Sequence, residues 1–254
     1  MKKAISYLFI FMGIQLLSGA VMAAAWNLFA HSTEESALKL ITTSAVAGIV
    51  TIVAFLATRW AEVSPAWLRT RPWTVLIWSV IASLGAIIPS AWLQEQLPEL
   101  PNIVEQEFDL ILKDRWGYVV IGLLASLSEE IVFRGAILRS LLRSSRLSVG
   151  GAIALSALMF SVIHLNPAQL PHAFIIGLLL GWMYYRTGSI LPGVAYHWAN
   201  NSVAYVLYNL YPDPDMKLVD LFGTDSRVLM AVGFSLLILL PALYQLHLNM
   251  RRAS

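Results

Sequence analysis

Cysteine is absent from this chain of 254 residues, and charged residues are scarce. The absence of cysteine excludes disulfide bonds and thiolate metal sites, and it leaves the redox compartment open. Asp, Glu, Lys and Arg make up 13% of the residues, whereas a soluble globular protein carries about 25%. So few charges cannot cover a water-facing surface, and a hydrophobic content of 58% excludes a disordered chain. The composition therefore predicts an integral membrane protein with several spans.

A strong excess of positive charge is also missing. The 17 basic and 15 acidic residues leave a formal net charge of +2. Nucleic-acid binding calls for a basic patch or stripe, which so small an excess does not suggest. We therefore expect the lipid bilayer, and no nucleic acid, among the partners of this chain.

Long apolar runs are what the sequence has instead, and most of them are long enough for a membrane span of about 20 residues, with 171–186 the shortest. We expect an all-α polytopic membrane protein with about eight transmembrane helices in one bundle, and a single domain over residues 1–254. The first run follows two lysines and resembles a secretory signal, but it is longer than the apolar region of about 7–15 residues in such signals, so we expect it to be retained. Residues 94–115 are expected to form a solvated connector with a possible amphipathic stretch at 103–112. The predicted spans are 4–30, 37–58, 73–93, 116–138, 149–165, 171–186, 188–211 and 228–248.

Basic residues are distributed unevenly between the two sides of these spans. With the N-terminus inside and alternating spans, eleven of the 17 basic residues lie on the inner side. This asymmetry follows the positive-inside rule and predicts that both termini are cytoplasmic. The inner basic residues are Lys2, Lys3, Arg59, Arg69, Arg71, Arg139, Arg143, Arg146, Arg186, Arg251 and Arg252.

Three charges lie inside the fourth predicted span, at Glu129, Glu130 and Arg134. Each charge at the centre of a span costs about 2.5–3.5 kcal/mol on insertion scales, so these three need compensation. Glu130 and Arg134 are four residues apart and can pair on one helix face. Glu129 is rotated by about 100° from Glu130, which leaves its carboxylate free to act as a general base. The alternative is a charge cluster that only joins helices.

Two later spans supply polar partners at the same four-residue spacing. The fifth contains Phe160 and His164, and the seventh contains His197 and Asn201. Taken alone, His164 also fits a core histidine with a hydrogen-bond partner, and the second pair fits hydrogen bonding between helices. Helix lengths place all these groups within a bilayer core of about 30 Å, though at different depths.

The three motifs together, Glu129-Glu130-x-x-x-Arg134, Phe160-x-x-x-His164 and His197-x-x-x-Asn201, resemble the CPBP family of intramembrane glutamic proteases. This family joins CAAX prenyl endopeptidases with bacteriocin-processing and immunity proteins. The resemblance covers about residues 120–205, within a catalytic core expected at about 116–211.

The resemblance implies a helical bundle with an intramembrane polar cavity and peptide-bond hydrolysis without a metal or cofactor. Carried over by position, Glu129 is the general base, His164 helps to hold the water, and His197 and Asn201 stabilise the oxyanion. Glu130, Arg134 and Phe160 support these groups. The expected substrate is a membrane-associated peptide or protein, and the expected location is a bacterial cytoplasmic membrane.

Other classes of function remain open from the residues alone. His164, His197 and one glutamate form a possible His₂Glu zinc site, although the usual His-Glu-x-x-His helix is missing. Intramembrane charges also suit a transporter, a scaffold or an immunity protein without catalytic activity. A transporter is disfavoured because no inverted repeat is visible.

Overall fold

The computed structural model describes residues 1–29, 36–62, 73–213 and 216–250, and all regular structure in these ranges is helical. The predicted all-α fold is therefore confirmed. The elements are α1 (Lys2–Phe29), α2 (Ala37–Ala57), α4 (Trp73–Glu95), α5 (Glu105–Lys113), η1 (Val119–Ala125), α6 (Ser126–Glu130), η2 (Ile131–Leu138), α7 (Arg139–Leu142), α8 (Val149–Val162), η3 (Pro167–Gln169), α9 (Leu170–Thr187), α10 (Leu191–Leu210), α11 (Leu218–Phe222) and α12 (Asp225–Asn249).

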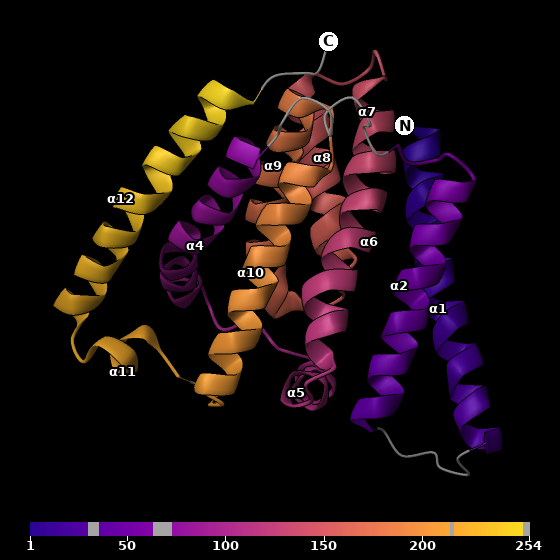
Figure 1. Ribbon diagram of the computed structural model, residues 1–254, viewed down its shortest axis with the longest axis horizontal. Helices are drawn as coiled ribbons and strands as arrows, with labels where there is room; N and C mark the ends of the chain where they lie inside the picture. Colours follow the sequence, from indigo (N-terminus) through magenta and orange to yellow (C-terminus); the bar gives the residue numbers. More distant parts are fainter. Residues whose placement is uncertain (30–35, 63–72, 214–215, 251–254) are drawn as a thin grey trace.

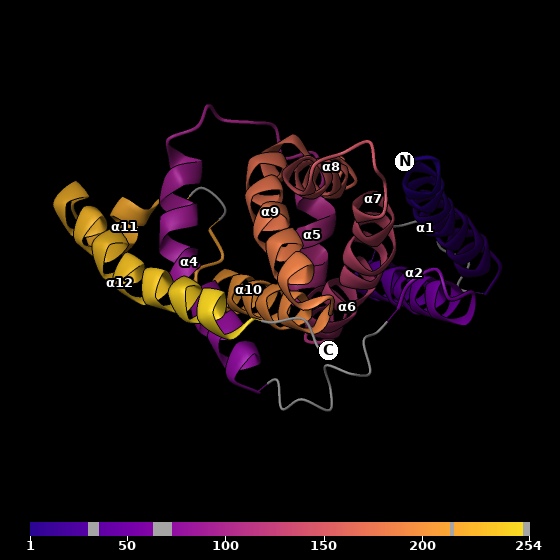
Figure 2. The same ribbon diagram turned by 90° about the horizontal axis from the view of Figure 1, so that it is seen from above.

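The long helices run between two ends of the molecule (Figure 1). Helix α1 begins and α12 ends at the same end, while α5 and α11 lie at the other. In the view along the helices, α8, α9, α10 and the fourth predicted span lie between an α4–α12 pair and an α1–α2 pair (Figure 2). The polar motifs are therefore carried by the central helices.

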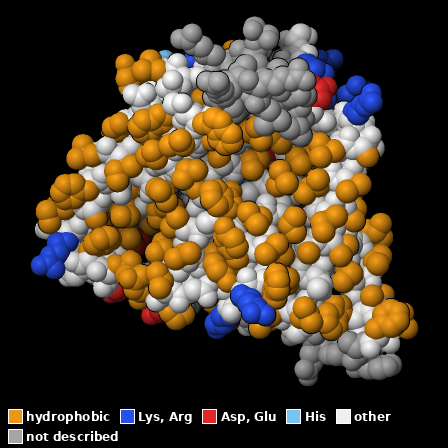
Figure 3. All heavy atoms as spheres, viewed as in Figure 1, with side chains coloured by type: hydrophobic (Ala, Val, Ile, Leu, Met, Phe, Trp, Pro, Cys, Tyr) orange, Lys and Arg blue, Asp and Glu red, His pale blue; other side chains and the backbone are white. Residues whose placement is uncertain are grey.

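The outer helices have the composition of membrane spans. Four helices, α1, α2, α4 and α12, are long and apolar enough to cross a bilayer. Only 11% of the most apolar window of α1 and 17% of that of α12 is buried within the protein. Their outward side chains include Leu16 and Leu237, with exposed fractions of 73% and 70%. Hydrophobic side chains also cover most of the face in Figure 3, with charged groups towards its margins. Such a surface requires an apolar solvent, so the chain is a membrane protein.

The total of eight spans stays a prediction. Helical segments occupy the other four predicted ranges, but none of them meets the same length and hydropathy limits. Helix α8 is apolar but has only 14 residues. The central segments carry the polar motifs, which lower their hydropathy.

The basic residues of the predicted inner side gather partly at one end of the bundle. Lys2, Lys3, Arg59, Arg139, Arg143 and Arg146 line one cavity there. Arg69, Arg71, Arg251 and Arg252 lie outside the described residues. The orientation of this end relative to a cell remains a prediction.

The fourth predicted span is one continuous helical run whose geometry alternates between π and α. The π-helical segments η1 and η2 enclose α6, which carries Glu129 and Glu130. Every residue of η2 is buried. Segments of π-helix are rare and occur often at functional sites, because they change the direction in which successive side chains point.

The connector between α4 and the fourth predicted span is more ordered than expected. Residues 105–113 form α5, which buries Ile111 and is bound to α10 by Asn209, whose side chain donates to the Leu112 carbonyl oxygen over 3.0 Å. Tyr208 of α10 also donates to Asp109. The amphipathic stretch predicted at 103–112 is therefore present as α5, whose apolar side packs while residues 105–107 and most of the preceding connector stay exposed.

Candidate active site

The centre of the polar cluster is an ion pair within one helical run. Arg134 Nη1 lies 2.6 Å from Glu130 Oε1, and both side chains are fully buried. This is the pair that their four-residue spacing predicts. Burying either charge alone would be very unfavourable, so each side chain provides the counter-charge that lets the other remain buried.

Arg134 also binds two neighbouring helices. Its Nη2 donates to the carbonyl oxygen of Gly177 in α9 over 3.3 Å. Its guanidinium carbon lies 4.5 Å from the ring centroid of Phe160 in α8, a distance suited to a cation–π contact. The ion pair therefore holds α6, α8 and α9 at one point, and the side chain of Phe160 covers it.

His197 of α10 lies between the two glutamates. Its Nδ1 donates to Glu130 Oε1 over 3.2 Å, because a carboxylate oxygen can only accept. The other ring nitrogen, Nε2, lies 3.8 Å from Glu129 Oε2. The His197 side chain is 7% exposed and the Glu129 side chain 20% exposed. Glu130 thus fixes the histidine ring, and Glu129 faces its outer edge with some access to solvent.

His164 follows the end of α8 and lies against the same aromatic ring. Its ring centroid is 5.1 Å from that of Phe160, which is itself 5.8 Å from His197. His164 Nδ1 donates to the Phe160 carbonyl oxygen over 2.8 Å, since a carbonyl oxygen only accepts. In a neutral ring, Nε2 then carries a lone pair and can accept a hydrogen bond from water.

Asn201 is directed towards the fourth predicted span. Its Nδ2 donates to the Ile121 carbonyl oxygen over 3.0 Å and to Ser126 Oγ over 3.4 Å. Both amide hydrogens are therefore engaged between α10 and the segment that leads into α6. Asn201 thus forms the hydrogen bonds between helices that were one of the two interpretations of its motif. The 3.4 Å contact with Ser126 is the weaker of the two.

Two glycines that the sequence analysis did not single out make this packing possible. A Cβ atom on Gly193 would lie 2.5 Å from Glu130 Oε2, and one on Gly177 would lie 2.9 Å from the Cβ of Ala157. Gly193 precedes His197 by one helical turn, and Gly177 stands four residues before Gly181. Two glycines four residues apart, as at Gly177 and Gly181, are a recognised signal for close packing of membrane helices. This spacing could have indicated Gly177 from the sequence.

His172 is a third histidine that the sequence analysis missed. It lies in the first turn of α9, in the neighbourhood of His164 and His197. The positions four residues before and after His172 are Ala168 and Ile176, so the sequence contains no polar motif that would have indicated this histidine.

The turn after His164 is anchored to the loop between α4 and α5. Asn166 is 1% exposed, and its Nδ2 donates to Asn102 Oδ1 over 2.8 Å while its Oδ1 accepts from the Ile103 amide over 3.2 Å. The Ala168 amide also donates to the Pro101 carbonyl oxygen over 3.3 Å. This loop therefore fixes the position of the chain immediately beyond His164.

A metal site would need a different arrangement of these side chains. Within the described ranges, no group of three or more His, Asp or Glu side chains converges closely enough to hold a metal ion. In both histidines Nδ1 is already engaged, by the Phe160 carbonyl oxygen in His164 and by Glu130 in His197, which leaves Nε2 for any further ligand.

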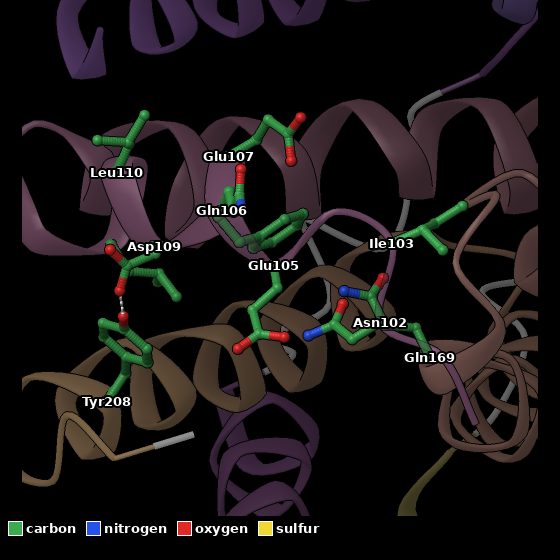
Figure 4. A pocket seen from close by; sticks show the side chains of 11 residues that line it. Asn102, Ile103, Glu105, Gln106, Glu107, Asp109, Leu110, Gln169 and Tyr208 are labelled. Atoms are coloured by element: carbon green, nitrogen blue, oxygen red, sulfur yellow. Dashed lines mark hydrogen bonds between the residues drawn. The ribbon is translucent and has the colours of Figure 1, made fainter. Parts of the chain in front are cut away.

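A groove of about 1000 Å³ lies on α5, away from this cluster. Figure 4 shows Glu105, Glu107 and Asp109 along it, with Tyr208 of α10 bonded to Asp109. The groove contains none of the predicted catalytic residues in its lining. It is an open acidic surface at the end of the bundle, and we assign it no part in the chemistry.

The apolar helices and the buried cluster of Glu130, Arg134 and His197 place this chain among the membrane proteins with an ionisable site between their helices. Residues 112–203 match the family model of the Rce1-like type II CAAX prenyl endopeptidases. This match confirms the resemblance to the CPBP family, and it indicates a protease-type domain in this part of the chain. The chain matches no curated protein and no solved structure.

Proposed function

We propose that this protein is an intramembrane endopeptidase in which Glu129 activates the attacking water. The observation that carries this proposal is the contrast between the two adjacent glutamates. Glu130 is fully buried and bound to Arg134 and His197, whereas Glu129 is 20% exposed and faces His197 Nε2. One carboxylate thus supports the site, and the other is available to water.

In the proposed reaction, Glu129 removes a proton from water as its oxygen attacks the carbonyl carbon of the peptide bond. His164 accepts a hydrogen bond from this water through Nε2. The tetrahedral intermediate then expels the amine, which takes the proton held by Glu129 as the carbon–nitrogen bond breaks. The products are a new carboxyl terminus and a new amino terminus, so the proposed step requires no oxidant or cofactor.

The oxyanion of the intermediate is stabilised by donors on α10. His197 donates from Nε2 in its imidazolium form, with Glu130 holding the ring through Nδ1. Asn201 joins it by exchanging the 3.4 Å contact with Ser126 for the oxyanion. General-base catalysis contributes about 10²–10⁴-fold and an oxyanion donor about 10²–10³-fold, so both groups are needed for a useful rate.

The substrate proposed is a peptide or protein that is anchored in or attached to the membrane, because Glu129 lies among membrane helices. We further propose a location in a bacterial cytoplasmic membrane with both termini in the cytoplasm, from the distribution of basic residues. Residues 1–254 then act as one membrane unit around the core at about 116–211.

Cells that carry Glu129→Gln in place of the wild-type chain test this proposal. Comparison of their membrane proteomes should show uncleaved precursors in the variant and shortened products in the wild type. Glu99→Gln, which removes an exposed carboxylate from the α4–α5 loop, serves as the matched control and should leave the products unchanged. Identical proteomes in Glu129→Gln and wild-type cells would favour a non-catalytic scaffold.

Metal dependence separates this mechanism from the zinc alternative. Cleavage by the purified protein should persist in a strong chelator, because Glu129 and the two histidines supply the base and the donors. Complete loss in chelator with recovery on adding Zn²⁺ would replace the proposed mechanism with a zinc-dependent one.

A further inference from the structure

A second polar cavity lies at the end of the bundle where α1 begins. It has a volume of about 650 Å³, and half of its twelve lining residues are basic. These come from three separate parts of the sequence: the start of α1, the end of α2, and the end of the fourth predicted span with the loop that follows it. The basic residues are Lys2, Lys3, Arg59, Arg139, Arg143 and Arg146.

Arg139 of α7 joins two of these segments, and Tyr7 of α1 packs on Trp60 at the end of α2. Arg139 Nη1 lies 2.5 Å from Glu62 Oε1, and its Nη2 donates to the Trp60 carbonyl oxygen over 3.2 Å. Arg59 adopts a left-handed backbone conformation with φ of 57°. Arg59 immediately follows the C-cap of α2, where a left-handed residue commonly ends a helix. The wall of the cavity is thus built from the end of α2 and from α7, joined through Arg139.

The positive charge of this cavity is largely uncompensated. Of the six basic side chains, Arg139 alone has a carboxylate within 4 Å among the described residues, namely Glu62. The other five are exposed at the surface, and together they give this cavity a positive potential that attracts an anion. Arginine also binds phosphate oxygens in bidentate geometry, which makes phosphate the preferred anion chemistry.

The surroundings of the cavity indicate a lipid as the carrier of that phosphate. Tyr7 and Trp60 line it, with their ring centroids 5.8 Å apart, and such residues are typical of the bilayer interface. On the same turns of α1, Ile5 and Phe9 are exposed by 42% and 64%. An acyl chain can lie along these apolar side chains while its headgroup enters the cavity. Basic pockets between membrane helices are known to bind anionic headgroups.

We infer that this cavity binds the phosphate headgroup of an anionic phospholipid. The bound lipid joins the α1–α2 hairpin to α7, which continues directly from the run that carries Glu129 and Arg134. It therefore stabilises the hairpin against the central helices. This inference rests on the basic cavity alone and does not depend on the proposed proteolysis.

The test uses the purified full chain in detergent, titrated with cardiolipin or phosphatidylglycerol, with phosphatidylcholine as the neutral lipid. Native mass spectrometry measures bound lipid, and thermal unfolding measures stabilisation. The anionic lipids should bind and raise the unfolding temperature, and Arg143→Gln/Arg146→Gln should weaken this binding at least tenfold. The matched control, Arg115→Gln/Arg227→Gln, removes two exposed charges at the opposite end and should bind as the wild type does.

Three results would overturn the inference. Equal weakening in both double variants would indicate general attraction by surface charge, and equal binding of neutral and anionic lipid would remove the role of the basic side chains. Inorganic phosphate or glycerol phosphate that stabilised the protein as strongly as the lipids at equal concentration would indicate a site for a soluble anion.

Discussion

Glu129 and Glu130 are neighbours in the chain but occupy different environments. Glu130 is enclosed by Arg134, His197 and Gly193, whereas Glu129 lies 3.8 Å from the edge of His197 and is 20% exposed. Helix geometry produces this difference, since successive residues point in directions about 100° apart. Two identical side chains can thus serve as a support and as a proposed base.

Removal of Arg134 should expose the energetic role of the buried pair. Arg134→Met leaves Glu130 charged and buried, and loss of one partner of such a pair costs about 3–5 kcal/mol. Unfolding in detergent micelles measures this loss. The double variant Glu130→Gln/Arg134→Met should recover much of the stability, because no buried charge remains. A double variant less stable than the single one would contradict this account.

Gly193 should tolerate no side chain. A Cβ atom there would lie 2.5 Å from Glu130 Oε2, so Gly193→Ala must displace a carboxylate that is held by two partners. Overpacking of this kind costs about 1–3 kcal/mol, measurable by thermal unfolding. Gly233→Ala in α12, where nothing lies within 4 Å of the added atom, is the control and should cause no loss. Equal stability of the two variants would show that Glu130 moves freely.

At the scale of helices, the apolar runs predicted where helices occur, and the four-residue spacings predicted which side chains share a face. Glu130 and Arg134 pair within one helical run, so their four-residue spacing was enough to predict the contact. The approach of His197 to both glutamates is not local, because it depends on how α10 packs against α6. Depth estimates from helix lengths left these groups at different levels, and the packing permitted by Gly177 and Gly193 brings them together.

The features that the sequence did not reveal also have physical causes. The 103–112 stretch was predicted to be amphipathic, but its hydrogen bonds to α10 depend on how the two helices lie in space and leave no mark in the sequence. The π-helical segments around α6 leave no mark in the hydrophobic pattern, since they depend on tertiary packing. His172 has no polar residue four positions away in the sequence. It comes near the other histidines because the turn before α9 brings the start of this helix close to the end of α8.

The turn after α8 should control the order of His164. Asn166→Ala removes two side-chain hydrogen bonds to the α4–α5 loop, each worth about 0.5–1.5 kcal/mol. Hydrogen–deuterium exchange should become faster in residues 96–104 and 163–169 and stay unchanged in α12. Asn249→Ala, an exposed residue bonded only within its own helix, is the matched control. Unchanged exchange in both segments would show that the turn is held by other contacts.

At the scale of the whole molecule, the absence of cysteine gives a direct test of the membrane arrangement. Single cysteines at Ser145, shortly after α7, at Leu237 in the middle of α12, and at Ser226 in the first turn of α12 place the only thiol at one end, in the middle and at the other end of the bundle. In sealed vesicles, an impermeant maleimide should label the two end positions from opposite sides. The Leu237 position should stay unlabelled in lipid. Labelling of both ends from one side would contradict the arrangement of α12 as a span.

The apolar exterior and the charged interior have a common explanation. Outer helices such as α1 and α12 have an apolar exterior, while the central helices carry charges that pair with one another. Among the described residues, the most deeply buried charges are Glu130 and Arg134, in the cluster that joins α6, α8, α9 and α10. We attribute the proposed catalysis to this cluster.

The central claim is tested most directly by the purified chain acting on membrane-anchored peptides in lipid vesicles, with new termini identified by mass spectrometry. Wild-type protein should produce defined cleavage products. Glu129→Gln should lower the rate at least about 100-fold while the thermal unfolding temperature stays unchanged, because only the base is lost. A folded Glu129→Gln variant that cleaved the same bonds at the wild-type rate would contradict the account.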